Sequence, residues 1–365
     1  MKGKQMSSNG EEAASLAMCL ATWSVPSMVL KAVLELNILE IIKKHGPGSQ
    51  LSAAQIVAQL PAATANPNAV VSVDRMLRLL ASFSVLTCSI RDGPDGGIER
   101  MYGLGPACDY LTKNEDGVSF AAFALLMQDK VIMDACNNMK EAIIGGGVPF
   151  NQTHGMNIFE YISKDSRFRE VFYNGMKHHS TIVTKKILEI YQGFSGISTL
   201  VDVGGATGDT ISLIVSKYPS INGINFDLPH VIQNAPSYPG VEHIAGDMYV
   251  TVPNADAIFM KWTFHTASDE QCIKLLKNCH TALPNNGKVI VCEYIVPEVP
   301  ETSYSANTAF IFDAIMFAVP GGKERTKRQY QALGKEAGFL SFQLICSACD
   351  TWIMEFMKDD PIRTD

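Results

Sequence analysis

The sequence predicts an α/β protein with a Rossmann-like, mostly parallel sheet that ends in an antiparallel hairpin, preceded by a mostly helical, winged-helix-like domain. The first observation is LVDVGGATGD at 200–209, an apolar strand that runs into a glycine turn and then a helical pattern. The second is the regular return of strand and helix patterns after it. The third is the pair SFQLICSAC and TWIMEFMK near the C-terminus, so close in sequence that only antiparallel pairing can join them.

Composition limits the classes of protein to consider. The 365 residues suffice for two domains, and 47% apolar with 18% charged residues is typical of a globular chain. The net charge of −7 argues against a dedicated nucleic-acid binder. We find neither a signal peptide nor an apolar run of about 18 residues that could span a membrane. Nine cysteines without framework spacing favour a reducing compartment. We therefore expect a cytoplasmic protein without nucleic-acid or membrane partners.

Residues 1–115 are predicted to form the N-terminal domain. The pattern over 13–44 predicts helices that are apolar on more than one face and interrupted at Pro26. Burial against a second copy of the chain would cover this surface, and packing on the same domain is the alternative. The first is favoured, so we expect a homodimer.

Two further helices and a hairpin complete this domain. Ser52 and Ser72 can cap helices that end at Leu60 and Ser84, and strand patterns flank a turn at 91–97. Helix, helix and hairpin is a winged-helix arrangement, which often binds DNA. The second helix offers only two arginines in an acidic chain, so a structural or dimerising role is favoured.

Residues 116–193 predict linking helices at 123–143, 159–162 and 168–191. The last carries Phe168, Phe172, Met176 and His179 on one face, at spacings of three and four. Such a stripe is more often core than pocket. Because this segment joins two domains, a contribution to a ligand pocket is the other interpretation.

Residues 194–365 are predicted to form the domain that contains the mostly parallel sheet. Strands are expected at 200–204, 223–228, 241–246, 255–262 and 287–295, with helices near 208–217, 229, 269–283, 317 and 326–337. Five such units and a closing hairpin are the pattern of the S-adenosylmethionine methyltransferase sheet. Folds that bind NAD lack the hairpin.

Polar residues end the predicted strands, at the edge where open parallel sheets bind ligands. Asp227 lies 23 positions after Gly204, near the spacing at which an acid reaches ribose hydroxyls, although it could simply cap a helix. Asp247 and Met248 offer an acceptor and an apolar side chain for an adenine, although Asp247 could be a turn residue. Lys261 and Glu293 end the next two strands.

His265 follows the strand that ends at Lys261, and it can take a proton near neutral pH. Glu293, and Glu324 in the loop PGGKERT, could fix its tautomer as in a catalytic triad. A structural histidine and a glutamate at a helix entry are the alternatives.

The chain resembles, over nearly its full length, the plant phenolic O-methyltransferases of the caffeic acid and isoeugenol type. The matching stretches are LVDVGGATG, INFDLPHVIQNAPSYPGVEHIAGDM, DAIFMKW-x-x-H, LPNNGKVIVCEYIVP and PGGKERT. The resemblance implies a dimer, S-adenosylmethionine as cofactor and no metal. It implies His265 as base flanked by Glu293 and Glu324, and cofactor contacts from Gly204, Asp227, Leu228, Asp247, Met248 and Lys261. It also implies a phenol site lined by Ile132, Phe168, Phe172, Met176, His179, Trp262, Ile315 and Met316, with Met28 supplied by the partner subunit.

Departures from that family affect the expected substrate. Ala206 stands where the family has a third glycine, Thr266 and Ala267 replace an acid and a tryptophan, and the loop before Pro320 is shorter. A neutral pocket with added volume, and apolar bulk from Met127 and Ile158, favours a lignan phenol. A benzylisoquinoline alkaloid comes second, and phenylpropenes and monolignols third. A catalytically dead cofactor-binding scaffold and a winged-helix regulator are the rival classes.

Overall fold

The computed structural model describes residues 8–60, 65–93 and 96–359. The chain divides into two compact units, residues 1–129 and 130–365. The predicted linking segment, 116–193, is shared between them, because its helices up to Met127 belong to the first unit and the others to the second.

The first unit is mostly helical. Its helices are α1 (Ser8–Ala21), α2 (Ser24–Glu35), α3 (Ile38–Lys44), α4 (Ala53–Val57), α5 (Ala69–Ser82), α6 (Cys108–Leu111) and α7 (Phe120–Met127). Strands β1 (Gln50–Ser52), β2 (Leu86–Asp92) and β3 (Ile98–Leu104) form an antiparallel sheet in the order β1-β3-β2. Residues of α2 to α5, the sheet and α6 share one apolar core. The predicted helix, helix and hairpin are present.

Two predicted details of this unit are wrong. The first break falls at Thr22–Trp23 rather than at Pro26, which lies in the first turn of α2, where its missing N–H has no intrahelical partner to lose. Ser72 is not a cap, because α5 begins at Ala69 and the N–H of Ser72 donates to the carbonyl of Asn68. Ser52 does cap α4, in a reciprocal capping box with Gln55.

The N-terminal helix exposes apolar side chains. Leu16, Met18 and Leu20 of α1 are 59%, 66% and 62% exposed. Among the described residues, no single helix has the length and apolar character to cross a membrane, and only the bent pair of α1 and α2 passes that test of length and composition together.

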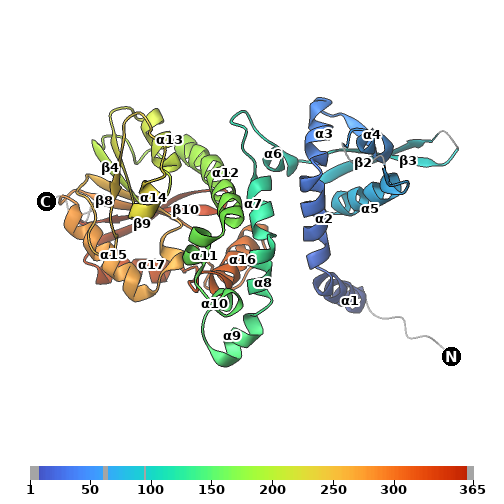
Figure 1. Ribbon diagram of the computed structural model, residues 1–365. Helices are drawn as coiled ribbons and strands as arrows, with labels where there is room; N and C mark the ends of the chain where they lie inside the picture. The colour runs from blue at the N-terminus through green and yellow to red at the C-terminus, as the bar shows by residue number, and fades with distance from the viewer. Residues whose placement is uncertain (1–7, 61–64, 94–95, 360–365) are drawn as a thin grey trace. The chain divides into compact units, whose positions relative to one another are not determined.

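The second unit is built on a seven-stranded sheet (Figure 1). Strands β4 (Thr199–Val203), β5 (Asn222–Asp227), β6 (Val241–Ala245), β7 (Ala257–Lys261) and β8 (Lys288–Glu293) are parallel. Strands β9 (Ser341–Ala348) and β10 (Thr351–Met357) form the antiparallel hairpin, and β10 pairs antiparallel with β8. The order is β6-β5-β4-β7-β8-β10-β9. The Rossmann-like sheet and its closing hairpin are confirmed.

Helices cover both faces of this sheet (Figure 1). Helices α12 (Ser166–Ile190), α13 (Asp209–Lys217) and the short α14 (Pro229–Ile232) pack on one side. On the other side, α15 (Asp269–Ala282) and α17 (Lys327–Glu336) bury Leu275, Leu276 and Leu333 against Val201, Ile258 and Val291. This core holds the parallel strands, and thereby their carboxyl ends, in fixed register.

A separate group of helices precedes α12. It consists of α8 (Lys130–Cys136), α9 (Met139–Gly145), α10 (Pro149–His154) and α11 (Ile158–Lys164), and α16 (Tyr304–Ala318) packs on α8 and α10. The helix predicted over 123–143 is therefore wrong as a single element. It breaks at Gln128–Asp129 and again at Asn137–Asn138, and asparagine is a poor helix former that favours turns.

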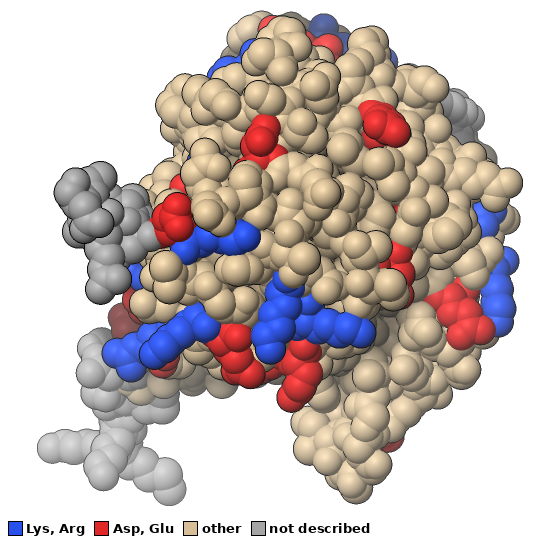
Figure 2. Space-filling view, turned by 90° about the vertical axis from the view of Figure 1, so that its left-hand side faces the viewer, with Lys and Arg blue, Asp and Glu red and all other residues tan. Residues whose placement is uncertain are grey.

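Charge is mixed on the face in Figure 2. Among the described residues visible there, Lys and Arg lie beside Asp and Glu, and tan surface separates the groups. This face offers no extended basic field of the kind that attracts a phosphate backbone.

Candidate active site

The carboxyl ends of the parallel strands gather the predicted polar residues at one edge of the second unit. Asp227 ends β5, Lys261 ends β7 and Glu293 ends β8, while Gly204 and Asp247 follow β4 and β6. Since β5, β4, β7 and β8 are neighbours in the sheet, most of these side chains lie along adjacent strands.

The turn after β4 has a left-handed backbone at three positions. Gly204 and Gly208 have φ of 73° and 85°, and Ala206 has φ of 50° although it carries a Cβ. The N–H of Ala206 donates to Asp227 Oδ2 at 2.9 Å, and its carbonyl accepts from Asn225 Nδ2 at 2.9 Å. Two side chains of β5 thus hold the turn in this conformation. Asn225 was not predicted.

The two predicted cofactor acids already accept backbone hydrogen bonds. Asp227 Oδ1 accepts from the N–H of Leu228 at 2.6 Å, and Asp247 Oδ1 accepts from the N–H of Tyr249 at 2.8 Å. Asp247 therefore also serves the local turn, as its alternative interpretation expected, whereas Asp227 does not cap α14, whose N-cap is Leu228. An ionised carboxylate has about four acceptor positions, so each can still bind a ligand. Burial raises the pKa of Asp227 above its usual value.

Lys261 and His179 come together across β7 and α12. Lys261 Nζ lies 3.1 Å from Ser180 Oγ, 3.5 Å from His179 Nδ1 and 4.1 Å from the centroid of the Trp262 ring. Burial lowers the pKa of Lys261 to about 8. Burial and the neighbouring Lys261 hold the pKa of His179 well below its usual value, so this imidazole stays neutral.

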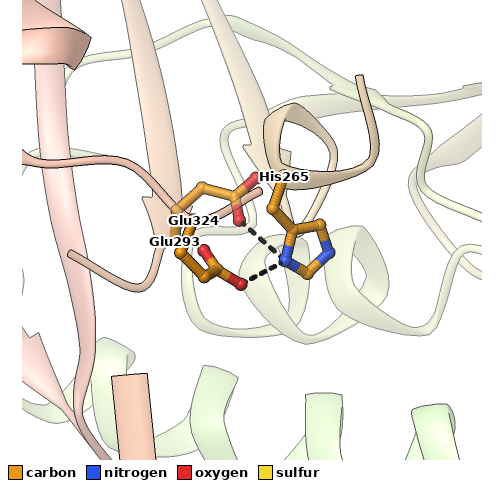
Figure 3. Close-up of side chains that lie close together, drawn as sticks. All are labelled: His265, Glu293 and Glu324. Carbon is orange, nitrogen blue, oxygen red and sulfur yellow. Dashed lines mark hydrogen bonds and ion pairs between the residues drawn. The ribbon is translucent and has the colours of Figure 1, made fainter. Parts of the chain in front are cut away.

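The predicted catalytic residues converge as Figure 3 shows. His265 lies in the short 3-10 helix η2 (Phe264–Thr266) after β7. Its Nδ1 is 2.8 Å from Glu324 Oε1 and 3.6 Å from Glu293 Oε2. All three side chains are buried. Because both carboxylates face the same ring nitrogen, Nε2 points away from them (Figure 3).

Electrostatics favours a basic imidazole at this position. Burial alone would lower the pKa of His265, but Glu293 and Glu324 outweigh it and the pKa is raised. Burial raises the pKa of Glu293 to about 7, with His265 opposing and Glu324 adding to the shift. A carboxylate can only accept a hydrogen bond, so Nδ1 carries the proton and Nε2 of the neutral ring keeps a lone pair. The three ligand atoms also lie within 4.8 Å of one another, a spacing that a cation could bridge.

Aromatic rings connect several predicted substrate residues. The Trp262 centroid lies 4.1 Å from that of His179 and 5.7 Å from that of His265. Phe312 and Tyr294, which sequence reasoning missed, lie 5.4 and 5.7 Å from Trp262. Both are aromatic residues close in sequence to predicted site residues, and this proximity is the signal by which they could have been found. Trp262 itself has φ of 55°, an uncommon conformation for a bulky residue.

The other predicted substrate residues are distributed over the helices of both units. Phe168 and Phe172 of α12 have centroids 6.3 Å apart, and Met176 follows on the same helix. Ile132 and Ile158 are buried in α8 and α11, and Ile315 and Met316 lie at the end of α16. Met28 and Met127 belong to the first unit. Their contribution to a substrate site stays a prediction.

Thr266 and Ala267 were expected to give a neutral pocket with added volume beside His265, and the structure does not support the added volume. Ala267 is 3% exposed and belongs to the apolar core beneath the sheet, with Phe264 and Cys272. Its small side chain therefore leaves no extra room beside the base. Thr266 is half-buried, and its hydroxyl donates to the carbonyl of Thr263 at 2.9 Å. The hydroxyl offers no charge to a substrate.

Two protein-family models match the chain. The O-methyltransferase domain matches residues 134–340, and the O-methyltransferase dimerisation domain matches residues 18–114.

Similar proteins come from plants. O-methyltransferase 13 of Lophophora williamsii is 59% identical over 95% of this chain and 96% of its own. Caffeic acid 3-O-methyltransferase of Catharanthus roseus is 58% identical over 97% of each chain, and esculetin O-methyltransferase of Kitagawia praeruptora is 54% identical over 97% of each. Among solved structures, human N-acetylserotonin methyltransferase superposes with a TM-score of 0.79 at 21% identity, covering 97% of this chain and 100% of that one. At that identity the likeness supports the fold.

Proposed function

Because the chain belongs to the S-adenosylmethionine-dependent O-methyltransferase family, we propose that it methylates a phenolic hydroxyl with His265 as general base. The family and the class of reaction follow from the matches above. The base, the substrate and the assembly are the proposal. One observation supports the base most directly: two buried carboxylates face Nδ1 of His265, which leaves Nε2 as the proton acceptor.

The chemistry required of the protein is limited. When bound, S-adenosylmethionine supplies an electrophilic methyl group on its sulfonium. The protein must hold the phenol in line and remove a proton whose pKa is about 10. Nε2 takes that proton, and the resulting imidazolium is stabilised by Glu324 at 2.8 Å and Glu293 at 3.6 Å. Burial of all three groups excludes water that would otherwise weaken this stabilisation.

The edge of the sheet fits the cofactor. Behind the glycine turn, Asp202 Oδ2 and Asn225 Oδ1 are buried acceptors without a hydrogen-bond partner among the described residues. Burial, with Asp227 nearby, raises the pKa of Asp202 to about 7. Asp227 suits ribose hydroxyls and Asp247 the adenine amino group. Leu228 and Met248 follow the same two strands, Lys261 ends β7, and Gly204 lets the backbone approach the ligand.

The substrate proposal changes with the position of Ala267. A lignan was favoured partly because alanine would open the pocket, and Ala267 lies in the core instead. A phenylpropanoid phenol of the caffeic acid type becomes the first candidate, supported by the relatives named for caffeic acid and esculetin. A neutral lignan phenol is the second, because Thr266 still stands where the family has an acid. An alkaloid amine would find no carboxylate there.

Incubation with S-adenosylmethionine and a panel of phenols, read by mass spectrometry, tests this function. We expect methyl transfer to at least one phenol, and kcat/KM for caffeic acid within tenfold of the best substrate. A lignan preferred by more than tenfold, about 1.4 kcal/mol, would reverse the ranking. Cofactor binding without turnover would indicate the dead scaffold, and specific DNA binding would indicate a regulator. A Thr266→Asp variant should alter the ranking only if that position faces the substrate.

We expect a homodimer assembled through the first unit. The dimerisation domain matches residues 18–114, and α1 exposes Leu16, Met18 and Leu20 in the single chain. Ultracentrifugation at micromolar concentration should give a dimer, and deletion of residues 1–30 should weaken it. A fully active monomer would contradict this assembly. The cytoplasmic location stays a prediction, and all nine cysteines are free thiols.

A further inference from the structure

The loop after α16 holds the backbone that carries His265. The N–H of Lys323 donates to the carbonyl of His265 at 2.9 Å, and Glu324 contacts its ring. A Cβ on Gly322 would collide with that same carbonyl oxygen, so only glycine allows this close approach. Asp313 of α16 fixes the loop in turn, because its Oδ1 accepts from the N–H of Glu324 at 2.8 Å.

Arg325, the next residue of this loop, is completely buried. Its Nη1 donates to the carbonyl of Phe264 at 2.7 Å, and its Nη2 donates to the carbonyl of Ala267 at 2.7 Å. Its Nε donates to Asp269 Oδ1 at 2.8 Å. These partners are the first residue of η2, the residue that follows η2, and the first residue of α15. One planar guanidinium therefore spans the segment that contains His265.

The contacts require the guanidinium geometry. A buried charge has a large desolvation penalty, and an apolar side chain would fill the same space without it. Three nitrogens donate in fixed directions to three different acceptors, which a lysine ammonium cannot reproduce from a single atom. Asp269 supplies the counter-charge and is itself held by Lys323 Nζ at 2.7 Å. Glu293 also holds this segment, because its Oε1 accepts from the N–H groups of Thr263 and Phe264 at 2.7 and 2.8 Å.

We propose that Arg325 is a positioning residue for the base, holding η2 so that His265 Nδ1 meets Glu324 and Nε2 meets the phenol. This inference rests on the proposed role of His265. Loss of the guanidinium would free the carbonyls of Phe264 and Ala267, and η2 would shift relative to Glu324. A shift of about 1 Å in a reacting group can cost on the order of 10²-fold in rate.

The test compares Arg325→Lys with Arg328→Lys. Arg328 has an 86% exposed side chain, and its ion pair is with Glu298, so it controls for the substitution itself. We expect Arg325→Lys to lower kcat by about 10–10²-fold, with cofactor affinity within about twofold of wild type. For the Arg328→Lys control, kcat and cofactor affinity should both stay within about twofold of the wild-type values. The pKa in the pH profile of kcat should fall, because His265 loses part of its contact with Glu324.

A double variant separates this inference from the proposed function. In a His265→Gln background, Arg325→Lys should have little further effect on turnover, because Arg325 acts through a base that is already absent. An equal loss in both backgrounds, or an unchanged kinetic pKa with a lower melting temperature, would show a merely structural arginine. A His265→Gln enzyme as active as wild type would instead overturn the proposed base.

If Arg325→Lys does not fold, Asp269→Asn provides the second variant. It leaves the two carbonyls that Arg325 contacts unchanged and removes the negative charge that pairs with Arg325 and with Lys323. We expect a decrease in kcat of about 3–10-fold with the same direction of change in the kinetic pKa. Full activity with an unchanged profile would overturn the proposal.

Discussion

Glu324→Gln removes a charge from the site while keeping the shape of the side chain. Glu324 Oε1 lies 2.8 Å from His265 Nδ1, and both side chains are buried. A hydrogen bond to a charged group contributes about 1.5–3 kcal/mol, and the imidazolium forms as the phenol loses its proton. Losing that stabilisation corresponds to a fall in kcat of roughly 10–10²-fold. Cofactor affinity should not change, because Glu324 faces the imidazole.

The pH profile gives the second readout of this variant. Glu293 and Glu324 together raise the pKa of His265 against the opposing effect of burial. The base works deprotonated, so wild-type activity should rise with pH through a pKa above the usual value of histidine. Without the charge of Glu324 the pKa of His265 falls. The activity of the variant should therefore rise at lower pH than that of wild type, although its maximal activity is lower. Steady-state kinetics at saturating cofactor, over about pH 5 to 9, measures both effects.

Glu293→Gln is the matched control. Its Oε2 is farther from Nδ1, at 3.6 Å, and its Oε1 accepts from two backbone N–H groups that an amide oxygen can still serve. We expect a smaller fall in kcat than for Glu324→Gln. A larger effect of Glu293→Gln, or a Glu324→Gln profile that keeps the wild-type pKa, would refute the assignment of Glu324 as the main partner of His265.

Three further predictions test the rest of the site. Ala206→Gly should stabilise the protein by about 0.5–1 kcal/mol in urea unfolding, because relief of the left-handed alanine, about 1–2 kcal/mol, exceeds the entropy that glycine adds to the unfolded chain; a less stable variant would contradict this. Asp227→Asn should weaken cofactor binding by about tenfold in calorimetry while the remaining amide oxygen still accepts from the N–H of Leu228, and an unchanged affinity would remove Asp227 from the cofactor site. Dialysis against a chelator should leave turnover unchanged, whereas a loss restored by a divalent cation would show a metal between His265, Glu293 and Glu324.

The sheet could be predicted because its information is local. Most parallel strands are apolar runs with a polar residue or a glycine at or just after the carboxyl end, and β9 and β10 are separated by too few residues for a crossover. The same reasoning placed Asp227, Lys261 and Glu293 at one edge. Helix breaks within 123–143 were missed because an apolar stripe continues across them while the backbone turns.

The contacts that complete the site depend on tertiary structure. Arg325 meets the carbonyl of Phe264 across 61 positions of sequence, and Phe312 meets Trp262 from a helix far along the chain. No periodicity relates such positions. Ala267 shows the converse, since its place beside the base in sequence suggested the pocket, while its side chain points into the core.

Turnover of a His265→Gln variant tests the central claim most directly. We predict that kcat falls by roughly 10²–10⁴-fold while calorimetry gives a wild-type affinity for S-adenosylmethionine. The buried contact of Nδ1 with Glu324 at 2.8 Å supports this prediction, because it holds the imidazole with Nε2 free to take a proton. A variant that turns over phenols at near the wild-type rate would contradict the account, because another group, or unaided ionisation, would then remove the proton.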